Sequence, residues 1–296
     1  MLSGRELLAS CQQRLENAGL HYGHGTGNAA DDALFLTLHV LGLGYDASEE
    51  ALEQAVSVEQ SEHLSALLQR RIEDRIPAAY LTQKMWFAGL EFFVDERVLI
   101  PRSPLAESII DGFEPWMDST KITRALEIGT GSGCIALALA HYFPSIDVVA
   151  TDISGDALAV ANVNLDKHAG LAERVRFLAA DLYPPDEQRF DLIVTNPPYV
   201  PHDEIPNLPA EYHAEPNIAL FAEDDGLEFI ARILDNAHDY LNPGGMLFFD
   251  VGDRWHSLER TFSDLSFTWC ELLRGGQGIG CIEQSALSKF NESRLE

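Results

Sequence analysis

The sequence DLIVTNPPY, residues 191–199, joins a strand pattern to a double proline and decides how this chain folds. Residues 191–195 form an apolar, β-branched run that predicts a buried strand. The strand must end at Asn196, because Pro197 and Pro198 have no N–H group to donate to a neighbouring strand. Asn196 therefore lies at the carboxyl end of a strand, where open α/β sheets bind their ligands.

The residues Asn196, Pro197, Pro198 and Tyr199, which we call the clamp, can hold a planar group that carries an NH2. The side-chain oxygen of Asn196 and a proline backbone carbonyl can each accept one N–H, and the Tyr199 ring can lie against the plane. The alternative is a plain proline turn at the end of a strand. The rest of the sequence has to decide between the two.

Outward from the clamp, strand patterns and helix patterns alternate along the chain. This alternation predicts a Rossmann-like α/β fold, with a mostly parallel sheet and helices on both faces. The last two strands, 267–273 and 279–283, are separated by too few residues for a crossover helix, so they should pair antiparallel. The other predicted strands are 125–128, 147–151, 175–178 and 246–251, the predicted helices are 135–142, 156–168 and 227–241, and a turn is predicted over 242–245.

The first part of the chain has helical periodicity and no catalytic group of its own. Apolar residues recur at helical spacing in 3–19 and 59–75, and Asn28 and Ser48 can cap two further helices. We therefore expect residues 1–83 to form a small N-terminal helical domain that docks the substrate.

A second change of pattern follows this helical part. Short aromatic and β-branched runs at 85–87, 90–94 and 98–100 predict strands of a β-hairpin linker over residues 84–104. The catalytic domain is then predicted over residues 105–296, beginning with a helix over 105–113.

A glycine-rich loop, EIGTGSG at residues 127–133, stands between the first strand of this domain and its first helix. Glycines at this place let a ligand approach the backbone closely. The loop alone suits NAD, a flavin or S-adenosylmethionine. Two details favour S-adenosylmethionine: the dinucleotide pattern would place Gly or Ala where Cys134 stands, and Glu127 suits a cationic ammonium better than a pyrophosphate.

Carboxylates follow the next two predicted strands. Asp152 comes about 20 residues after the glycine loop, where a carboxylate can accept both ribose hydroxyls. A helix N-cap is the alternative role for Asp152, although Ser154 suits that role better. Asp181 can accept the adenine amino group, with Leu182 against the ring, or it is only a turn residue at the end of its strand.

The composition limits the possible partners. The 296 residues include 20 Lys+Arg against 47 Asp+Glu, a formal net charge of −27. Such a surface repels nucleic-acid phosphates and attracts a basic protein, although the acidity can also serve solubility alone. The cysteines Cys11, Cys134, Cys270 and Cys281 have no metal-site spacing, and no signal peptide or membrane-spanning run is evident, so we expect a cytoplasmic protein without a metal.

Taken together, these motifs resemble the class I S-adenosylmethionine-dependent methyltransferases. More narrowly, the chain resembles the HemK/PrmC/PrmB family of protein-(glutamine-N5) methyltransferases over nearly its whole length. Release-factor enzymes of that family usually have Pro-Arg-Pro-Asp/Glu-Thr-Glu after the hairpin, whereas residues 101–107 here are PRSPLAE. That departure, together with YGHGT at 22–26, is similar to the PrmB branch. The other matching segments are residues 75–81, 99–102, 127–133, 196–199, 215–216 and 225–227.

The resemblance implies a seven-stranded sheet, S-adenosylmethionine as cofactor, and N5-methylation of a glutamine in the large-subunit ribosomal protein uL3. It implies that Asn196, Pro197 and Tyr199 are catalytic and that the whole clamp binds the substrate. The cofactor-binding residues that it implies are Glu127, Gly129, Thr130, Gly131, Gly133, Asp152, Asp181, Leu182 and Asn196.

Four other functions fit parts of the sequence. An adenine-N6 methyltransferase on DNA or RNA would use a similar clamp, but it needs a cationic track, and the segments flanking the clamp are acidic. A release-factor methyltransferase of the same family is a second alternative. A cofactor-binding scaffold in ribosome assembly would not need an intact clamp, and a nicotinamide oxidoreductase would need a hydride-transfer acid that is not evident.

Overall fold

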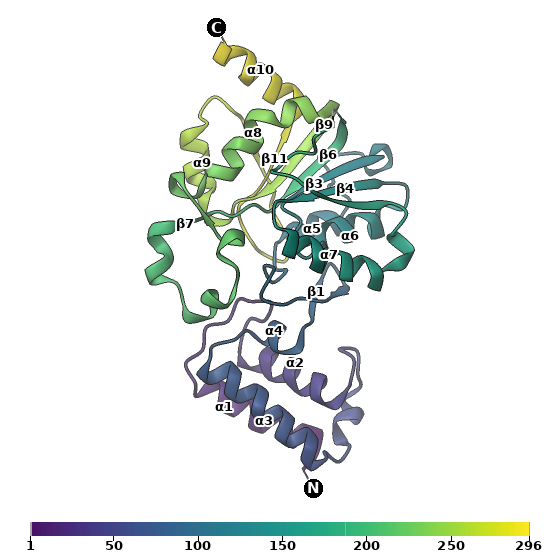
Figure 1. Ribbon diagram of the computed structural model, residues 1–296, viewed down its shortest axis with the longest axis vertical. Helices are drawn as coiled ribbons and strands as arrows, with labels where there is room; N and C mark the ends of the chain where they lie inside the picture. The colour runs from purple at the N-terminus through teal and green to yellow at the C-terminus, as the bar shows by residue number, and fades with distance from the viewer. Residues whose placement is uncertain (1, 187, 296) are drawn as a thin grey trace.

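The computed structural model describes residues 2–186 and 188–295 and has a central seven-stranded sheet (Figure 1). The strand order is β10-β11-β9-β6-β3-β4-β5. Strands β3, β4, β5, β6 and β9 run parallel, and β11 and β10 are antiparallel to their neighbours, as predicted. The strands are β3 Arg124–Ile128, β4 Asp147–Asp152, β5 Val175–Ala179, β6 Phe190–Thr195, β9 Leu241–Asp250, β10 Thr268–Trp269 and β11 Ile279–Glu283.

Alternating side chains of the central strands build two separate cores. Leu192 and Val194 of β6 join a core under α5 and α6, whereas Ile193 joins a core under α8 and α10. Figure 1 shows these helices on opposite faces of the sheet. The helices are α5 Leu105–Ile110, α6 Cys134–Tyr142, α7 Gly155–Lys167, α8 Glu228–Tyr240, α9 Trp255–Thr261 and α10 Gln284–Leu295.

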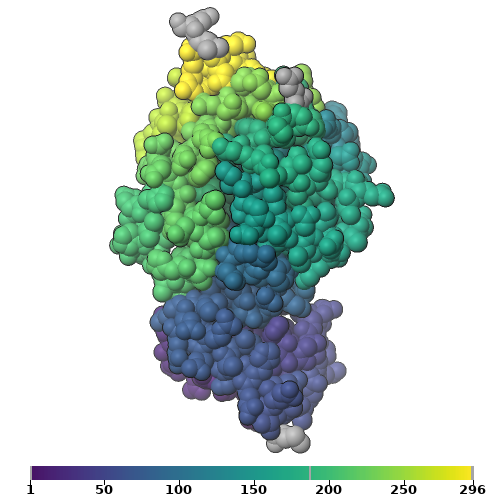
Figure 2. Space-filling view, viewed as in Figure 1, coloured from purple at the N-terminus to yellow at the C-terminus, as the bar shows by residue number. Residues whose placement is uncertain are grey.

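The N-terminal helices gather at the end of the molecule away from α10, as the purple and blue lobe of Figure 2. Ser3 and Ser57 begin α1 and α3 with capping boxes, and Asn28 caps α2 as predicted. Their apolar core also contains Val94 and Val98 of the linker and Ala157 of α7. The helices are α1 Gly4–Glu16, α2 Ala29–Leu41, α3 Val58–Glu73 and α4 Ala78–Thr82, with a 3-10 turn, η1 Glu49–Glu53.

The linker contains the predicted hairpin in part. Strands β1 (Met85–Phe87) and β2 (Leu90–Phe92) pair antiparallel across Ala88 and Gly89. The prediction of a strand over residues 98–100 was wrong. The Arg97 guanidinium pairs with Asp95 in a turn, and Val98 and Ile100 are buried without a strand partner among the described residues.

Two other sequence predictions need correction. Residues 242–245 belong to β9, which has an irregularity opposite β6, and are not a turn before it. The strand predicted at 267–273 is only Thr268–Trp269. Helices α9 and α10 were not predicted.

The segment between the clamp and α8 also escaped prediction. It consists of short turns around a two-strand ladder, with β7 (Val200–Pro201) parallel to β8 (Phe221–Ala222). The 3-10 turns are η4 His202–Asn207, η5 Ala210–Ala214, η6 Asn217–Ala219 and η7 Asp224–Gly226. We call residues 200–228 the strap. Within the described residues, no helix is both long and apolar enough to cross a membrane.

Candidate active site

Two cavities meet at the carboxyl edge of the sheet, where β3, β4 and β6 end. The larger one, about 360 Å³, runs from the glycine loop to Asn196, and the smaller one, about 220 Å³, lies between Tyr199 and Asp250. Asn196, Pro197 and Pro198 line both cavities. The clamp therefore forms a wall that the two cavities share, which is the arrangement needed for transfer of a group between two ligands.

The glycine loop borders the larger cavity and has no side chains at Gly129 and Gly131 to fill it. A Cβ atom added at Gly129 or Gly131 would meet nothing within 4 Å, so these two positions face free space. At Gly133 the reason for glycine is different, because a Cβ there would lie 2.9 Å from the Phe177 ring and 3.2 Å from Ala161. The loop thus leaves room for a ligand and still lets α6 pack closely on the sheet.

Glu127 lies at the loop end of this cavity and is 1% exposed. Its Oε2 accepts hydrogen bonds from Thr130 Oγ1 at 2.5 Å and from the Ala136 N–H at 2.9 Å. Burial raises the pKa of Glu127 to about 8, and those hydrogen bonds only partly oppose the rise. A ligand cation next to Glu127 would restore its negative charge, so the site fits the ammonium group of S-adenosylmethionine.

Asp152 ends β4 and lines the same cavity. One carboxylate oxygen accepts from the Gly131 N–H at 2.8 Å and the other from the Ser154 N–H at 2.9 Å. Ser154 caps α7, as the sequence indicated, so Asp152 is not needed as a helix cap. Burial raises the pKa of Asp152 above its ordinary value despite these hydrogen bonds, and its remaining lone pairs suit hydroxyl donors.

Asp181 and Leu182 line the larger cavity at its other end. Asp181 is half exposed and accepts a hydrogen bond from Arg232 Nη2 at 2.7 Å. Arg232 also lines the cavity, and sequence reasoning missed it, since α8 is far from Asp181 along the chain. The role of Asp181 toward an adenine ring stays a prediction.

The clamp presents an unpaired acceptor. Asn196 Oδ1 is buried and has no hydrogen-bond partner within residues 2–186 and 188–295. A buried carbonyl oxygen without a partner costs free energy, and such a group is expected to be satisfied by a bound donor. The clamp therefore fits a ligand N–H at this oxygen.

Tyr199 lines the smaller cavity, and glycines surround it. A Cβ at Gly252 would lie 2.8 Å from the Tyr199 ring, and one at Gly226 would lie 2.2 Å from its carbonyl oxygen. Burial raises the pKa of Tyr199 above its ordinary value, so the phenol keeps its proton. The ring is thus held as a neutral, fixed surface beside Asn196.

Three charged residues near the clamp were not identified from the sequence as site residues. Arg102 lines both cavities and pairs with Glu215, while Asp250, 2% exposed, lines the smaller cavity. Ser103 Oγ donates to Asp250 Oδ2 at 2.7 Å, and burial raises the pKa of Asp250 to about 6. The sequence indicates Arg102 only as part of the matching segment 99–102. Its partner Glu215 lies 113 residues later, so the pairing leaves no local sequence signal. Across the described part of the chain, no His/Cys/Asp/Glu group suitable for a metal ion was found.

Comparisons with known proteins identify the fold and the family. The family model described as "Methyltransferase small domain" matches residues 115–209, from before β3 to the strap. The fold is similar to that of the hMettl16 catalytic domain solved with MAT2A 3′UTR hairpin 6, at a TM-score of 0.50 and 18% identity over 76% of this chain and 81% of that one. The fold is thus that of a class I S-adenosylmethionine-dependent methyltransferase, as predicted.

Sequence relatives narrow the family. A protein of Xanthomonas campestris pv. campestris named "Ribosomal protein uL3 glutamine methyltransferase" is 44% identical over 94% of this chain and 90% of its own length. Proteins with the same name from Neisseria meningitidis serogroup B and Burkholderia pseudomallei are 42% and 38% identical, over 93% and 96% of this chain and 90% and 95% of their own lengths. The chain belongs to the family of ribosomal protein uL3 glutamine methyltransferases.

Proposed function

We propose that this protein methylates the side-chain nitrogen of a glutamine in the ribosomal protein uL3, with S-adenosylmethionine as the methyl donor. The observation that carries the proposal is Asn196 Oδ1, a buried acceptor without a partner among the described residues, on the wall shared by the two cavities. The names of the sequence relatives support uL3 as the protein that bears the glutamine.

The cofactor supplies an electrophilic methyl group on a sulfonium sulfur. Glu127 would hold its ammonium and Asp152 its ribose, beside the backbone of Gly129, Thr130 and Gly131. Gly133 does not line this cavity, and its proposed part in cofactor binding is to shape the loop by its close packing on Phe177 and Ala161. Asp181, Leu182 and Asn196 are proposed to complete this binding site.

The chain's own residues have to make an amide nitrogen reactive. That nitrogen is a poor nucleophile, because its lone pair is shared with the carbonyl group. Asn196 Oδ1 and the Pro197 carbonyl would accept its two N–H groups and hold the lone pair toward the methyl donor. Tyr199 would pack against the amide plane, with Pro198 fixing the turn. No general base is required, since the nitrogen becomes acidic after transfer and its proton can pass to water.

Charge supports a basic protein as the partner. The strap carries no Lys or Arg, and outside the buried ion pairs of Glu211 and Glu215 its acidic residues are exposed or half-buried: Asp203, Glu204, Glu223, Asp224, Asp225 and Glu228. An acidic surface beside the clamp attracts a basic protein and repels nucleic acid. We propose that the helices in residues 1–83 contribute to docking and that the enzyme works in the cytoplasm without a direct nucleic-acid requirement.

The experiment that tests this function offers purified uL3, and separately adenine-containing DNA and RNA, to the enzyme with labelled methyl donor at several salt concentrations. We expect label on a uL3 glutamine, decreasing as salt rises, and none on nucleic acid. Label on adenine with uL3 unmodified would refute the proposal in favour of an adenine-N6 methyltransferase.

A further inference from the structure

Arg102 is a cation at the junction of the two cavities. It follows the linker directly, and its side chain, 22% exposed, lines both the larger and the smaller cavity. Asn196 lines the same two cavities, so a ligand held there lies in a space that the Arg102 guanidinium also borders.

Glu215 fixes the orientation of this guanidinium. Arg102 Nη1 donates to Glu215 Oε1 at 2.5 Å, and Nη2 donates to Oε2 at 2.7 Å, a bidentate pair. The Ile100 N–H also donates to Glu215, at 3.0 Å, and His24 Nε2 lies 3.4 Å from Oε2. With contacts on both oxygens, Glu215 cannot rotate away from Arg102 without losing several of them.

Both members of the pair stay charged. Burial alone would raise the pKa of Glu215, but Arg102 and the hydrogen bonds lower it to about 2. Burial likewise opposes the charge on Arg102, and Glu215 more than offsets this, so the Arg102 pKa lies above its ordinary value. The pair is therefore neutral as a whole at any working pH.

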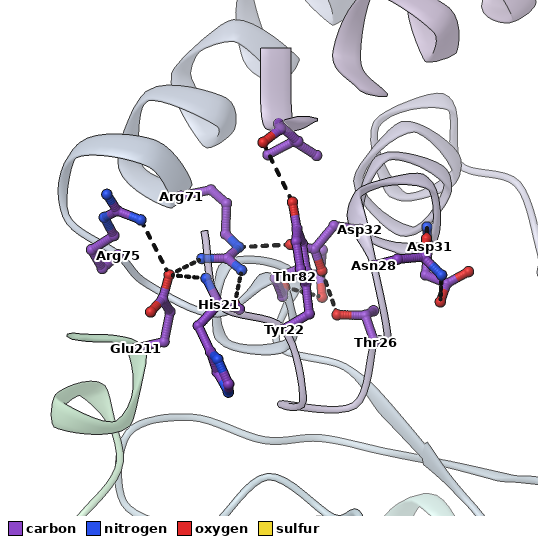
Figure 3. A network of polar contacts seen from close by, with 12 residues as sticks. His21, Tyr22, Thr26, Asn28, Asp31, Asp32, Arg71, Arg75, Thr82 and Glu211 are labelled. Carbon is purple, nitrogen blue, oxygen red and sulfur yellow. Dashed lines mark hydrogen bonds and ion pairs between the residues drawn. The ribbon is translucent and has the colours of Figure 1, made fainter. Parts of the chain in front are cut away.

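The strap segment that carries Glu215 is itself anchored. Four residues earlier, Glu211 Oε1 lies 3.3 Å from Arg71 Nη1 and accepts the His21 N–H at 3.0 Å, and Arg71 Nε donates to Asp32 at 2.7 Å (Figure 3). Buried ion pairs stabilise a fold only weakly, because desolvation offsets their attraction. What they can give is a fixed arrangement, in this case of η5 against the N-terminal helices.

Arg102 keeps unused donors. Its Nη1 donates to Ile100 O and Glu215, and its Nη2 to Glu215, but within the described residues no acceptor is found for its Nε–H. The two cavities are thus lined by an unpaired acceptor, Asn196 Oδ1, and by a cation with an unused donor, Arg102. A primary amide has the complementary set, two N–H donors and one carbonyl acceptor.

We propose that Arg102, positioned by Glu215, binds the side-chain carbonyl oxygen of the target glutamine and is a specificity-determining residue of this enzyme. This inference rests on the proposed function. The neutral Arg102–Glu215 pair accepts a neutral amide, and the carboxylate of Asp250 in the smaller cavity repels a second carboxylate. The site consequently selects glutamine and rejects glutamate.

The contribution of Arg102 should fall mainly on binding. A hydrogen bond to the amide oxygen fixes the rotation of the amide plane and so places its nitrogen at Asn196. The same hydrogen bond draws electron density away from the nitrogen, so it does not speed the transfer itself. We therefore expect Arg102→Met to raise the KM for uL3 about tenfold or more, with kcat changed only a few-fold.

The experiment measures KM for uL3 and the inhibition constant of a uL3 variant in which the target glutamine is replaced by glutamate. In wild type, the inhibition constant of the glutamate form should be at least about ten times the KM for uL3. In Glu215→Gln the Arg102 guanidinium is no longer neutralised by a carboxylate. The ratio of the inhibition constant of the glutamate form to the KM for uL3 should therefore fall markedly. A merely structural role of Glu215 would not produce this change in preference. Arg124→Met, at the opposite edge of the sheet, serves as a control and should leave both constants unchanged.

Calorimetry with S-adenosylmethionine separates this assignment from its competitor, a contact between Arg102 and the cofactor's carboxylate. We expect cofactor affinity within about twofold of wild type in Arg102→Met. A lost cofactor affinity with an unchanged KM for uL3 would overturn the proposal, as would an unchanged preference in Glu215→Gln. If Glu215→Gln fails to bind cofactor, or if Arg102→Met does so because Glu215 is left buried without its cation, the double variant Arg102→Met/Glu215→Gln, which leaves no unpaired charge, should still raise the KM. Wild type that does not methylate uL3 would refute the proposed function itself.

Discussion

Glu127 in the glycine loop and Glu215 in the strap are equally well buried, 1% and 3% exposed, yet their electrostatics are opposite. The pKa of Glu127 is raised to about 8, because it is desolvated and no cation from residues 2–186 or 188–295 offsets this. The pKa of Glu215 is lowered to about 2, because Arg102 lies against it. The two regions therefore differ in what neutralises the buried carboxylate: we propose a ligand cation for Glu127, whereas Arg102 does so for Glu215.

This difference indicates how to interpret buried charge in the rest of the molecule. A buried group of the site that lacks a partner for its charge or lone pair, such as Glu127 or Asn196 Oδ1, is where we propose that a ligand binds. A buried group whose partner is present, such as Glu215 or Glu211, marks a place where the chain fixes its own geometry. Changes of the first kind should affect ligands, and changes of the second kind should affect folding or positioning.

The largest effect is expected where the chain completes itself. Arg71→Met leaves Asp32 buried without its cation and leaves Glu211 with only Arg75, 3.5 Å away, so we expect a loss of about 3–5 kcal/mol in the free energy of unfolding. Urea denaturation measures this loss. Arg5→Met removes the exposed ion pairs with Glu49 and Glu53, and it should change the free energy of unfolding by too little to measure. If both variants lost the same free energy of unfolding, the buried ion pairs would stabilise the fold no more than the exposed ones do.

The next effect concerns the clamp, where the ligand completes the site. Asn196→Ala should reduce turnover by roughly 100-fold or more, by analogy with the loss of an oxyanion-hole donor, and should weaken cofactor binding far less, because Glu127, Asp152 and the glycine loop carry most of the proposed cofactor site. Asn196→Asp should also be poor, because it places an anion where a neutral amide stood. Methyl-transfer assays on uL3 measure both variants. Full activity in either would remove Asn196 from the mechanism.

A smaller effect is expected at the ribose position. Asp152→Ala should weaken binding of S-adenosylmethionine and of its demethylated product by about 1.5–3 kcal/mol each, because it removes a charged hydrogen-bond acceptor. Titration calorimetry on both ligands tests this. If only one ligand were weakened, Asp152 would not contact the part that the two ligands share.

The smallest effect is a pH dependence. With a pKa of about 8, Glu127 is mostly protonated at pH 7 and must lose its proton to pair with a ligand cation. Cofactor affinity should therefore rise about tenfold from pH 7 to pH 9, apart from the titration of the ligand's own amine. Glu127→Gln should keep only the ligand's titration. Identical pH profiles in wild type and Glu127→Gln would show that no cation meets this carboxylate.

Local sequence determined much of the fold and the position of the clamp. The proline pair ends β6 at Thr195, directly before Asn196, whatever surrounds it. The glycine loop, Asp152 and Asp181 lie at the ends of strands that periodicity alone predicts. The pairing of Arg102 with Glu215 could not be predicted, because it depends on how the strap folds back over the linker. The strap itself has no periodic pattern, and α10 has too weak an apolar face to be recognised.

The glycines around Tyr199 give the clamp a second kind of constraint. A Cβ at Gly278 would lie 1.9 Å from Gly252 O, so Gly278 supports Gly252, which in turn lies against the ring. In a library of random variants selected for methyl transfer, Gly226, Gly252 and Gly278 should tolerate as few substitutions as Asn196. Such a screen would rank three positions without any reactive group among the most sensitive in the chain, because they set the space in which Tyr199 stands.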